Sequence, residues 1–175
     1  MKWFISDLHL GHEKLLESRG FKDIEAHDNH ILDGIKLQVK SEDTLFVLGD
    51  VSVAGPRKRE CFQRMNEIHC TKYLIGGNHD PGDTGLLTLF DRVHGAYVLG
   101  NERWILTHVP VHPQCMGDRF TANLHGHMHR SMIYDDPRYL NLSVEMTGYL
   151  PVDLPTVKVL LDRQKQQHTE EGGMA

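Results

Sequence analysis

Long apolar runs are absent from the 175-residue chain, and no stretch approaches the roughly 18 consecutive apolar residues that a membrane-spanning helix needs. The N-terminal segment offers only Trp3–Ile5 as an apolar run before Asp7, which is too short for the apolar region of a signal peptide. Three cysteines, Cys61, Cys70 and Cys115, form no CxxC pair, which argues against a disulfide framework and against a thiolate zinc site. We therefore expect a cytoplasmic protein that does not engage a membrane.

Positive charge is also in deficit, with 19 Lys and Arg against 24 Asp and Glu and a net charge of −5. This balance lacks the broad basic surface of a duplex-binding protein, so we do not expect a nucleic-acid polymer as the partner. The content of 39% apolar and 25% charged residues is typical of a globular protein. We expect a single domain over residues 1–163 and a polar, flexible tail over residues 164–175.

Apolar periodicity predicts alternating strands and helices, and hence a mixed α/β domain. Short runs rich in β-branched and aromatic residues predict strands at Lys2–Ser6, Thr44–Leu48, Lys72–Ile75, Thr121–His125 and Tyr139–Val144. Helical spacing predicts helices over Ile24–Val39, from Pro56 to about His69, over Gly82–Phe90, and after a capping Asp153. Arg92–Leu99 and Arg103–Thr107 are typical of a hairpin that turns at Gly100–Asn101.

Histidine, in contrast, is abundant, with 13 residues. Many of them belong to five polar clusters beside predicted strands, which are Asp7-Leu8-His9, Gly49-Asp50, Gly77-Asn78-His79-Asp80, Thr107-His108 and His125-Gly126-His127-Met128-His129. Each cluster alone has an ordinary explanation, because Gly-Asp and Gly-Asn are common turn sequences. Together they place carboxylates, an amide and imidazoles where α/β folds hold their binding groups. These donors suit Mn²⁺, Fe, Zn²⁺ or Ni²⁺ and disfavour Cu(I) and iron–sulfur chemistry.

The ordered series DxH, GD, GNHD, H and GHxH resembles the calcineurin-like metallophosphoesterase superfamily. The opening segment Phe4–His12 (FISDLHLGH) is similar to that of its small single-domain bacterial and phage phosphoesterases. This resemblance extends from about Lys2 to Leu161. It implies a sandwich of two mixed β-sheets flanked by helices, with a dinuclear metal centre at the strand ends.

The resemblance also implies a role for individual residues. The implied ligands are Asp7, His9 and His129 for one ion, Asn78, His108 and His127 for the other, and Asp50 as the bridge between them. We expect two divalent or trivalent ions, with Mn²⁺ favoured over Fe, Zn²⁺ or Ni²⁺. Thr107 precedes His108 where many relatives have glycine, which affects only the local backbone.

Outside the ligand set, His79 would lie near the leaving-group oxygen as a general acid, and Asp80 would hydrogen-bond to His79 and orient it. His12, Asn78 and Arg57 are candidates for contacts with the substrate. The segment after Asp50 lacks the Asp-Arg pair of protein serine/threonine phosphatases, and their GNHE is GNHD here, so that subclass is disfavoured.

A bridging water between two such cations becomes a hydroxide near neutral pH and can attack phosphorus in line with the leaving group. We expect a phosphodiesterase that acts on a small phosphoester or nucleotide, such as 2′,3′- or 3′,5′-cAMP. The alternatives are a phosphomonoesterase or nuclease of the same superfamily, or a metal-bound scaffold without turnover. A serine hydrolase is disfavoured because the chain has no GxSxG motif. Both a monomer and a homodimer are compatible with the sequence.

Overall fold

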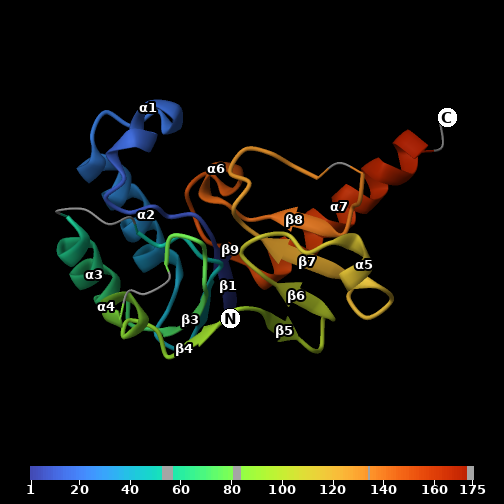
Figure 1. Cartoon of the computed structure of the whole chain (residues 1–175), viewed down its shortest axis with the longest axis horizontal. Coiled ribbons are helices and arrows are strands. Elements are labelled where there is room, and N and C mark those ends of the chain that lie inside the picture. Colours follow the sequence, from blue (N-terminus) through green and yellow to red (C-terminus); the bar gives the residue numbers. More distant parts are fainter. Residues whose placement is uncertain (53–56, 81–83, 134, 173–175) are drawn as a thin grey trace.

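The computed structural model describes residues 1–52, 57–80, 84–133 and 135–172, and these residues form two mixed β-sheets (Figure 1). The first sheet contains, in spatial order, β4 (Arg92–His94), β3 (Thr71–Ile75), β2 (Thr44–Val47), β1 (Lys2–Ile5) and β9 (Val152–Asp153). The second contains β5 (Tyr97–Leu99), β6 (Trp104–Leu106), β7 (Ala122–His125) and β8 (Tyr139–Asn141). Only β9 and β5 run antiparallel to their neighbours among the described strands, so both sheets are mixed, as the sequence predicts.

Helices cover these sheets and fill the connections between strands. They are the 3₁₀ helix η1 (Glu13–Leu15), α1 (Leu16–Arg19), α2 (Ile24–Gln38), α3 (Lys58–Asn66), α4 (Thr84–Leu87), α5 (Pro113–Met116), α6 (Val144–Thr147) and α7 (Leu154–Gly172). Asp153 caps α7 as predicted, because its Oδ1 accepts a hydrogen bond of 2.9 Å from the Thr156 N–H. The predicted helix starts at Pro56 and Gly82 lie outside the described residues. No described helix combines the length and apolarity needed to cross a membrane.

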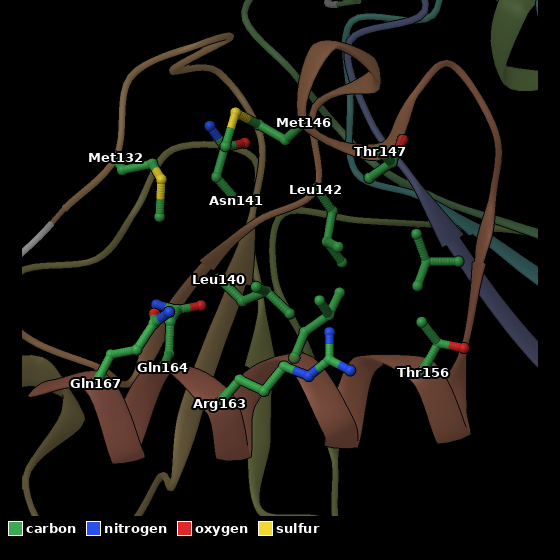
Figure 2. A pocket seen from close by; sticks show the side chains of 12 residues that line it. Met132, Leu140, Asn141, Leu142, Met146, Thr147, Thr156, Arg163, Gln164 and Gln167 are labelled. Carbon is green, nitrogen blue, oxygen red and sulfur yellow. The ribbon is translucent and has the colours of Figure 1, made fainter.

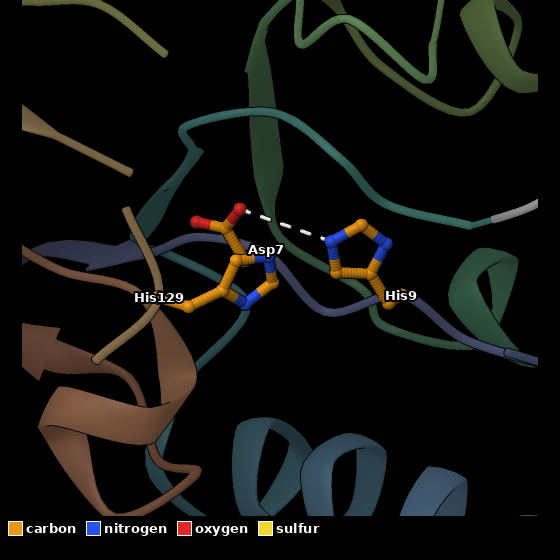
Figure 3. Close-up of side chains that lie close together, drawn as sticks. All are labelled: Asp7, His9 and His129. Carbon is orange, nitrogen blue, oxygen red and sulfur yellow. Dashed lines mark ion pairs between the residues drawn. The ribbon is translucent and has the colours of Figure 1, made fainter. Parts of the chain in front are cut away.

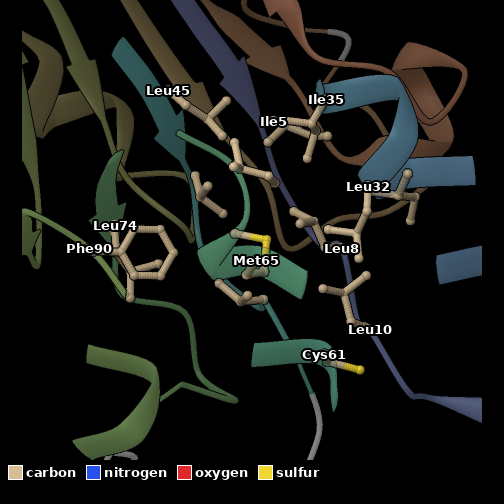
Figure 4. Packing of buried hydrophobic residues seen from close by; sticks show 14 of the residues in the cluster. Ile5, Leu8, Leu10, Leu32, Ile35, Leu45, Cys61, Met65, Leu74 and Phe90 are labelled. Carbon is tan, nitrogen blue, oxygen red and sulfur yellow. The ribbon is translucent and has the colours of Figure 1, made fainter. Parts of the chain in front are cut away.

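Alternate residues of the central strands face different layers of the molecule. Ile5 of β1 belongs to an apolar cluster with Leu32 of α2 and Met65 of α3 (Figure 4). Its neighbour Phe4 belongs to a second cluster that includes Leu124 of β7. Because consecutive side chains of a strand point to opposite faces, the first sheet packs against helices on one side and against the second sheet on the other. This arrangement confirms the expected sandwich of two mixed sheets flanked by helices.

Two predicted strands differ from the structure. The segment Arg92–Leu99 forms two strands in different sheets, because the chain bends at Gly95 after β4 has paired in parallel with β3. Its second half, β5, forms the predicted hairpin with β6. Strand β8 ends at Asn141 rather than Val144, because the Asn141 Oδ1 accepts the Ser143 N–H at 3.0 Å and turns the backbone into α6.

Helix α7 continues to Gly172, so the segment expected to be a polar tail has helical backbone over most of its length. The helix is tied to the second sheet at Gln164, whose Nε2 donates a hydrogen bond of 2.8 Å to the Tyr139 carbonyl. A polar stretch without apolar periodicity gives no sequence signal for such a helix. The flexibility of this segment, like the expected domain boundary at residue 163, stays a prediction.

Helix α2 offers a matched test of the packing between helices and sheet. Ile35 is fully buried in the first cluster, whereas Leu37 on the same helix is 75% exposed. Ile35→Ala should lower the free energy of unfolding by about 2–5 kcal/mol, because it removes buried methylene and methyl groups and leaves a cavity. Leu37→Ala should change it by less than about 0.5 kcal/mol. Urea denaturation measures both, and equal losses would contradict this packing.

Candidate metal centre

All seven residues that the sequence predicts as metal ligands lie in loops directly after strands. They are Asp7 and His9 after β1, Asp50 after β2, Asn78 after β3, His108 after β6, and His127 and His129 after β7. The first three of these strands belong to one sheet and the last two belong to the other. The candidate centre is therefore assembled from both sheets.

Asp7, His9 and His129 form the first group, in which each residue offers a ligand atom within 4.8 Å of the others (Figure 3). The His9 side chain is buried, and within the described part of the chain neither of its nitrogens has a hydrogen-bond partner. Burial lowers the pKa of His9 to about 3, although the Asp50 carboxylate acts in the opposite direction. The imidazole is therefore neutral, with a lone pair free for a metal ion.

The spacing of this group fits an ion better than a hydrogen bond. The His9 Nε2 lies 3.9 Å from Asp7 Oδ1 and 3.6 Å from Asp50 Oδ2, which is too far for hydrogen bonding. Two ligand atoms that each lie ~2.1 Å from a metal ion are ~3.0 Å apart at a right angle and ~3.6 Å apart at 120°. An ion between these atoms would satisfy the otherwise orphaned nitrogen.

Asp50, His108 and His127 form the second group, whose ligand atoms also lie within 4.8 Å of one another. The Asn78 Oδ1 joins them, at 3.0 Å from both His108 Nε2 and His127 Nδ1. The His108 Nδ1 lies 2.7 Å from the Leu48 carbonyl, which can only accept a hydrogen bond. This bond places a proton on Nδ1, so Nε2, which faces the Asn78 and Asp50 oxygens, is the nitrogen that would bind an ion.

Asp50 lies between the two groups. Its Oδ2 is 3.6 Å from the His9 Nε2 of the first group and 3.4 Å from the His108 Nε2 of the second. Burial alone would raise the pKa of Asp50, but the His108 imidazole and a hydrogen bond from the His79 N–H hold it at about 2. A carboxylate that stays ionised in this position is suited to bridge two cations.

The backbone of the centre is held in an uncommon conformation. Among the described residues other than glycine, seven have a positive φ, and five of these are Asp7, His9, Asp50, His127 and His129. This left-handed conformation costs about 1–2 kcal/mol per residue, so the surrounding contacts must enforce it. Strain of this kind gathers at functional sites because it aims side chains that a regular strand would point elsewhere.

Glycines in the motifs allow the loops to approach one another closely. A Cβ atom on Gly126 would overlap the Ser6 hydroxyl and the Asp7 carboxylate, and one on Gly77 would overlap the Asp50 carboxylate. The glycines of GHxH and GNHD are therefore required by packing between ligand loops rather than by turns alone.

Two residues that support the ligands were missed by sequence reasoning. The Ser143 Oγ donates to Asp7 Oδ2 at 2.9 Å, and Glu145 Oε1 accepts from His129 Nδ1 at 2.8 Å. The bond to Glu145 raises the pKa of His129. Neither residue belongs to a recognisable motif, and both reach the centre only because α6 packs beside the loop after β1.

Asp80 does not have the role that the sequence predicts. Its Oδ2 accepts hydrogen bonds from the Asp50 N–H (2.9 Å) and the Gly77 N–H (2.8 Å), and its Oδ1 accepts one from the Val51 N–H (3.0 Å). Among the hydrogen bonds of the described residues, none joins Asp80 to His79. The expectation that Asp80 orients His79 is corrected, because both oxygens are engaged in fixing the loop that carries Asp50.

Two residues with predicted roles toward the substrate, His12 and His79, lie beside candidate ligands. The His79 side chain is 47% exposed, and its Nε2 lies 4.0 Å from Asp50 Oδ2. The His12 ring centroid is 5.5 Å from that of His9. Arg57 lies beside the Gly11 backbone and pairs with Glu60 at 3.0 Å.

A separate cavity of about 420 Å³ lies between α7 and β8 (Figure 2). Leu140, Leu142 and Met132 supply apolar walls, and Arg163 and Gln167 supply polar groups from α7. Its lining includes none of the candidate metal ligands, so it takes no part in the centre.

No protein-family model matches this chain. The Gene 66 protein of Mycobacterium phage D29 is 39% identical to it over 79 residues, and that of Mycobacterium phage L5 is 36% identical over 80 residues. Each match covers 45% of this chain and 39% of the phage protein. The chain thus matches less than half the length of these relatives.

Solved structures are similar over more of the chain. The protein of unknown function AQ665 from Aquifex aeolicus has a TM-score of 0.77 at 24% identity, over 91% of this chain and 98% of that one. The Pseudomonas putida nuclease MPE has a TM-score of 0.51 at 24% identity, over 73% and 61% of the two chains. An archaeal phosphodiesterase has a TM-score of 0.53 at 15% identity, over 88% and 93%. At these identities the likeness shows that the chain shares the fold of these proteins.

The contacts of Asp80 predict that its side chain stabilises the folded protein. Asp80→Asn should lower the free energy of unfolding by roughly 2–3 kcal/mol, because one amide oxygen cannot accept from all three N–H groups, two of which are buried. His79→Ala should leave it within about 0.5 kcal/mol, because that side chain is half-exposed and, among the described residues, its imidazole holds no buried group in place. Urea denaturation of both variants separates the two roles. Equal free energies of unfolding for the two variants would contradict the role of Asp80 in holding the loop that carries Asp50.

Proposed function

We propose that this chain is a dinuclear-metal-dependent phosphodiesterase that hydrolyses small phosphodiesters such as 2′,3′- or 3′,5′-cAMP. The observation that carries the proposal is the position of Asp50, whose Oδ2 lies 3.6 Å from His9 Nε2 and 3.4 Å from His108 Nε2. One carboxylate shared by two ligand groups is the arrangement needed to hold two ions side by side. The named activities of two structural neighbours, a nuclease and a phosphodiesterase, support phosphoester hydrolysis in general.

The ligands of the two groups are oxygen and imidazole nitrogen atoms, which fits Mn²⁺ and also Fe, Zn²⁺ or Ni²⁺. When bound, the pair of ions would polarise phosphoryl oxygens and supply the nucleophile near neutral pH. Asp7, Asp50 and the imidazoles would fix the ions, and Asn78 would contact both the second ion and the substrate.

We assign His79 to the protonation of the leaving group. Its half-exposed side chain borders Asp50, so its imidazolium can donate a proton to an oxygen that departs toward solvent. His12, whose ring lies beside that of His9, and Arg57 would bind the remaining phosphate oxygens. Asp80 acts indirectly, by holding the loop that carries Asp50.

A nuclease is the second candidate, because one structural neighbour carries that name. The net charge of −5 weighs against a long nucleic-acid substrate. A phosphomonoesterase and a scaffold without turnover use the same ligands, and only turnover measurements separate them from a diesterase.

Metal removal and refilling test the proposed reaction. Chelator-stripped protein should be inactive and should regain activity with Mn²⁺. We expect a higher rate on an aryl phosphodiester than on the matching monoester, and measurable hydrolysis of 2′,3′- or 3′,5′-cAMP. Asp50→Asn should lower activity by at least about 10³-fold, because both ions lose their shared ligand. Asp33→Asn, on the exposed side of α2, is the matched control and should retain full activity.

Other results would favour the alternatives. A preference for the monoester would make the chain a phosphomonoesterase. Cleavage of plasmid DNA with a strong salt dependence would make it a nuclease, because phosphate contacts release counterions. Two bound ions without turnover on any of these substrates would favour the scaffold.

The general-acid role of His79 has its own test. His79→Ala should retain both ions and lose about 10²–10⁴-fold in rate on diesters with alkyl leaving groups, which need protonation. On a nitrophenyl diester, whose leaving group is stable as an anion, the loss should be much smaller. Elemental analysis gives the metal content and steady-state assays give the rates. A uniform loss on both substrates would argue against this assignment.

A further inference from the structure

A buried network of charged and polar side chains lies behind the first ligand group, on the side away from solvent. Its members are Arg19 of α1, His27 and Asp28 of α2, and Glu145 of α6, and the side chains of Arg19 and Glu145 are only 1% and 3% exposed. None of these four residues belongs to the motifs that point to the metal centre. Buried charges are costly unless they are paired, so their retention here calls for an explanation.

Arg19 lies at the centre of this network, where it contacts both Glu145 and His27. Its Nη2 donates to the Asp7 carbonyl at 2.8 Å and its Nη1 donates to the Leu8 carbonyl at 3.0 Å. These carbonyls belong to the loop in which Asp7 and His9 have a positive φ. The planar guanidinium thus fixes two successive peptide groups of the strained ligand loop from behind.

Glu145 connects the same arginine to the third ligand of the group. Its Oε1 accepts from Arg19 Nε at 2.9 Å and lies 2.8 Å from Arg19 Nη2. The same oxygen accepts from His129 Nδ1 at 2.8 Å. This bond leaves the His129 Nε2 as the nitrogen available to an ion.

The far end of the network anchors the loop a second time. Arg19 can only donate, so the 2.8 Å contact between its Nη1 and His27 Nε2 makes that nitrogen an acceptor. The proton of His27 therefore lies on Nδ1, which donates to Asp28 Oδ1 at 2.8 Å. Asp28 in turn accepts the Gly11 N–H at 3.2 and 3.1 Å. The segment from Asp7 to Gly11 is held at both ends.

We propose that Arg19 and Glu145 are positioning residues that set the geometry and affinity of the first ion alone. They contact all parts of the first group: the backbone next to Asp7 and His9, and the side chain of His129. None of their hydrogen bonds reaches Asp50, Asn78, His108 or His127, so the second group keeps its own supports. The inference rests on the metal centre of the proposed function. It states that the two ion sites of that centre are supported by different residues.

Titration of metal-stripped protein with Mn²⁺, measured by isothermal titration calorimetry, tests whether Arg19 and Glu145 support the first ion site alone. The wild type should bind two ions. Glu145→Gln should weaken one of them by about 10–100-fold, the range found when the partner of a ligating histidine is removed, and leave the other unchanged. His129→Ala should weaken the same ion, which identifies it as the first. Electron paramagnetic resonance of Glu145→Gln at one equivalent of Mn²⁺ should show an isolated ion rather than a coupled pair.

Asp136→Asn is the matched control. It removes a carboxylate that pairs with Arg138 at 2.6 Å but makes no hydrogen bond to a candidate ligand among the described residues. Both ions should bind to this variant as they bind to the wild type. Arg19→Lys keeps the charge but cannot serve all of the acceptors of a guanidinium, so it should also weaken the first ion selectively.

Loss of one charge from a buried pair can unfold a protein, and a double variant covers that case. Arg19→Met/Glu145→Met removes both charges together and should fold, as circular dichroism would show, yet still bind the first ion weakly. Unchanged affinity for both ions in Glu145→Gln or in the double variant would overturn the inference and leave the proposed function intact. Equal weakening of both ions would also overturn it. A wild-type chain that binds no ion would overturn the proposed function itself.

Discussion

The burial of two carboxylates beyond the ends of neighbouring strands is the constraint on which the rest of this structure depends. Asp7 and Asp50 end neighbouring parallel strands and are almost completely buried, so each must be stabilised locally. Asp7 accepts hydrogen bonds from the Ser143 hydroxyl and the His127 N–H, and Asp50 accepts one from the His79 N–H. These bonds offset part of the desolvation cost, and bound cations, held with His9 between the two carboxylates, would offset the remainder. The glycines, the strained loops and the surrounding network all serve this one arrangement.

Much of the centre could be predicted from the sequence, because the prediction required only the strands and the rule that parallel strands end at the same edge. Four of the five motifs directly follow a short apolar run, and the structure places Asp7, Asp50 and Asn78 after three adjacent strands. The fold class followed from the same pattern, together with the family resemblance. Helix α2 was predicted with nearly correct bounds because its apolar residues recur at helical spacing, and the structure adds Asp23 as its capping residue.

The remaining features depend on contacts between segments far apart in the chain, which local patterns do not encode. Glu145 reaches His129 only through the packing of α6, and Arg19 reaches Asp7 only because α1 folds back over the first loop. Asp80 follows His79 directly, which suggested a partnership, yet a buried carboxylate beside three free N–H groups binds those first. The division of Arg92–Leu99 between two sheets likewise depends on a bend at Gly95 that a run of strand-forming residues does not reveal.

Both ligand groups draw on both sheets, and this has a mechanical consequence. The first group combines two residues that follow β1 with one that follows β7, and the second combines one that follows β2 with two from the other sheet. An ion held by such a group would cross-link the two sheets of the sandwich. Sliding or splaying of one sheet against the other would stretch coordination bonds as well as separate apolar side chains. Ion binding would then stabilise one relative orientation of the two sheets, and a change in that orientation would alter the affinity for the ions.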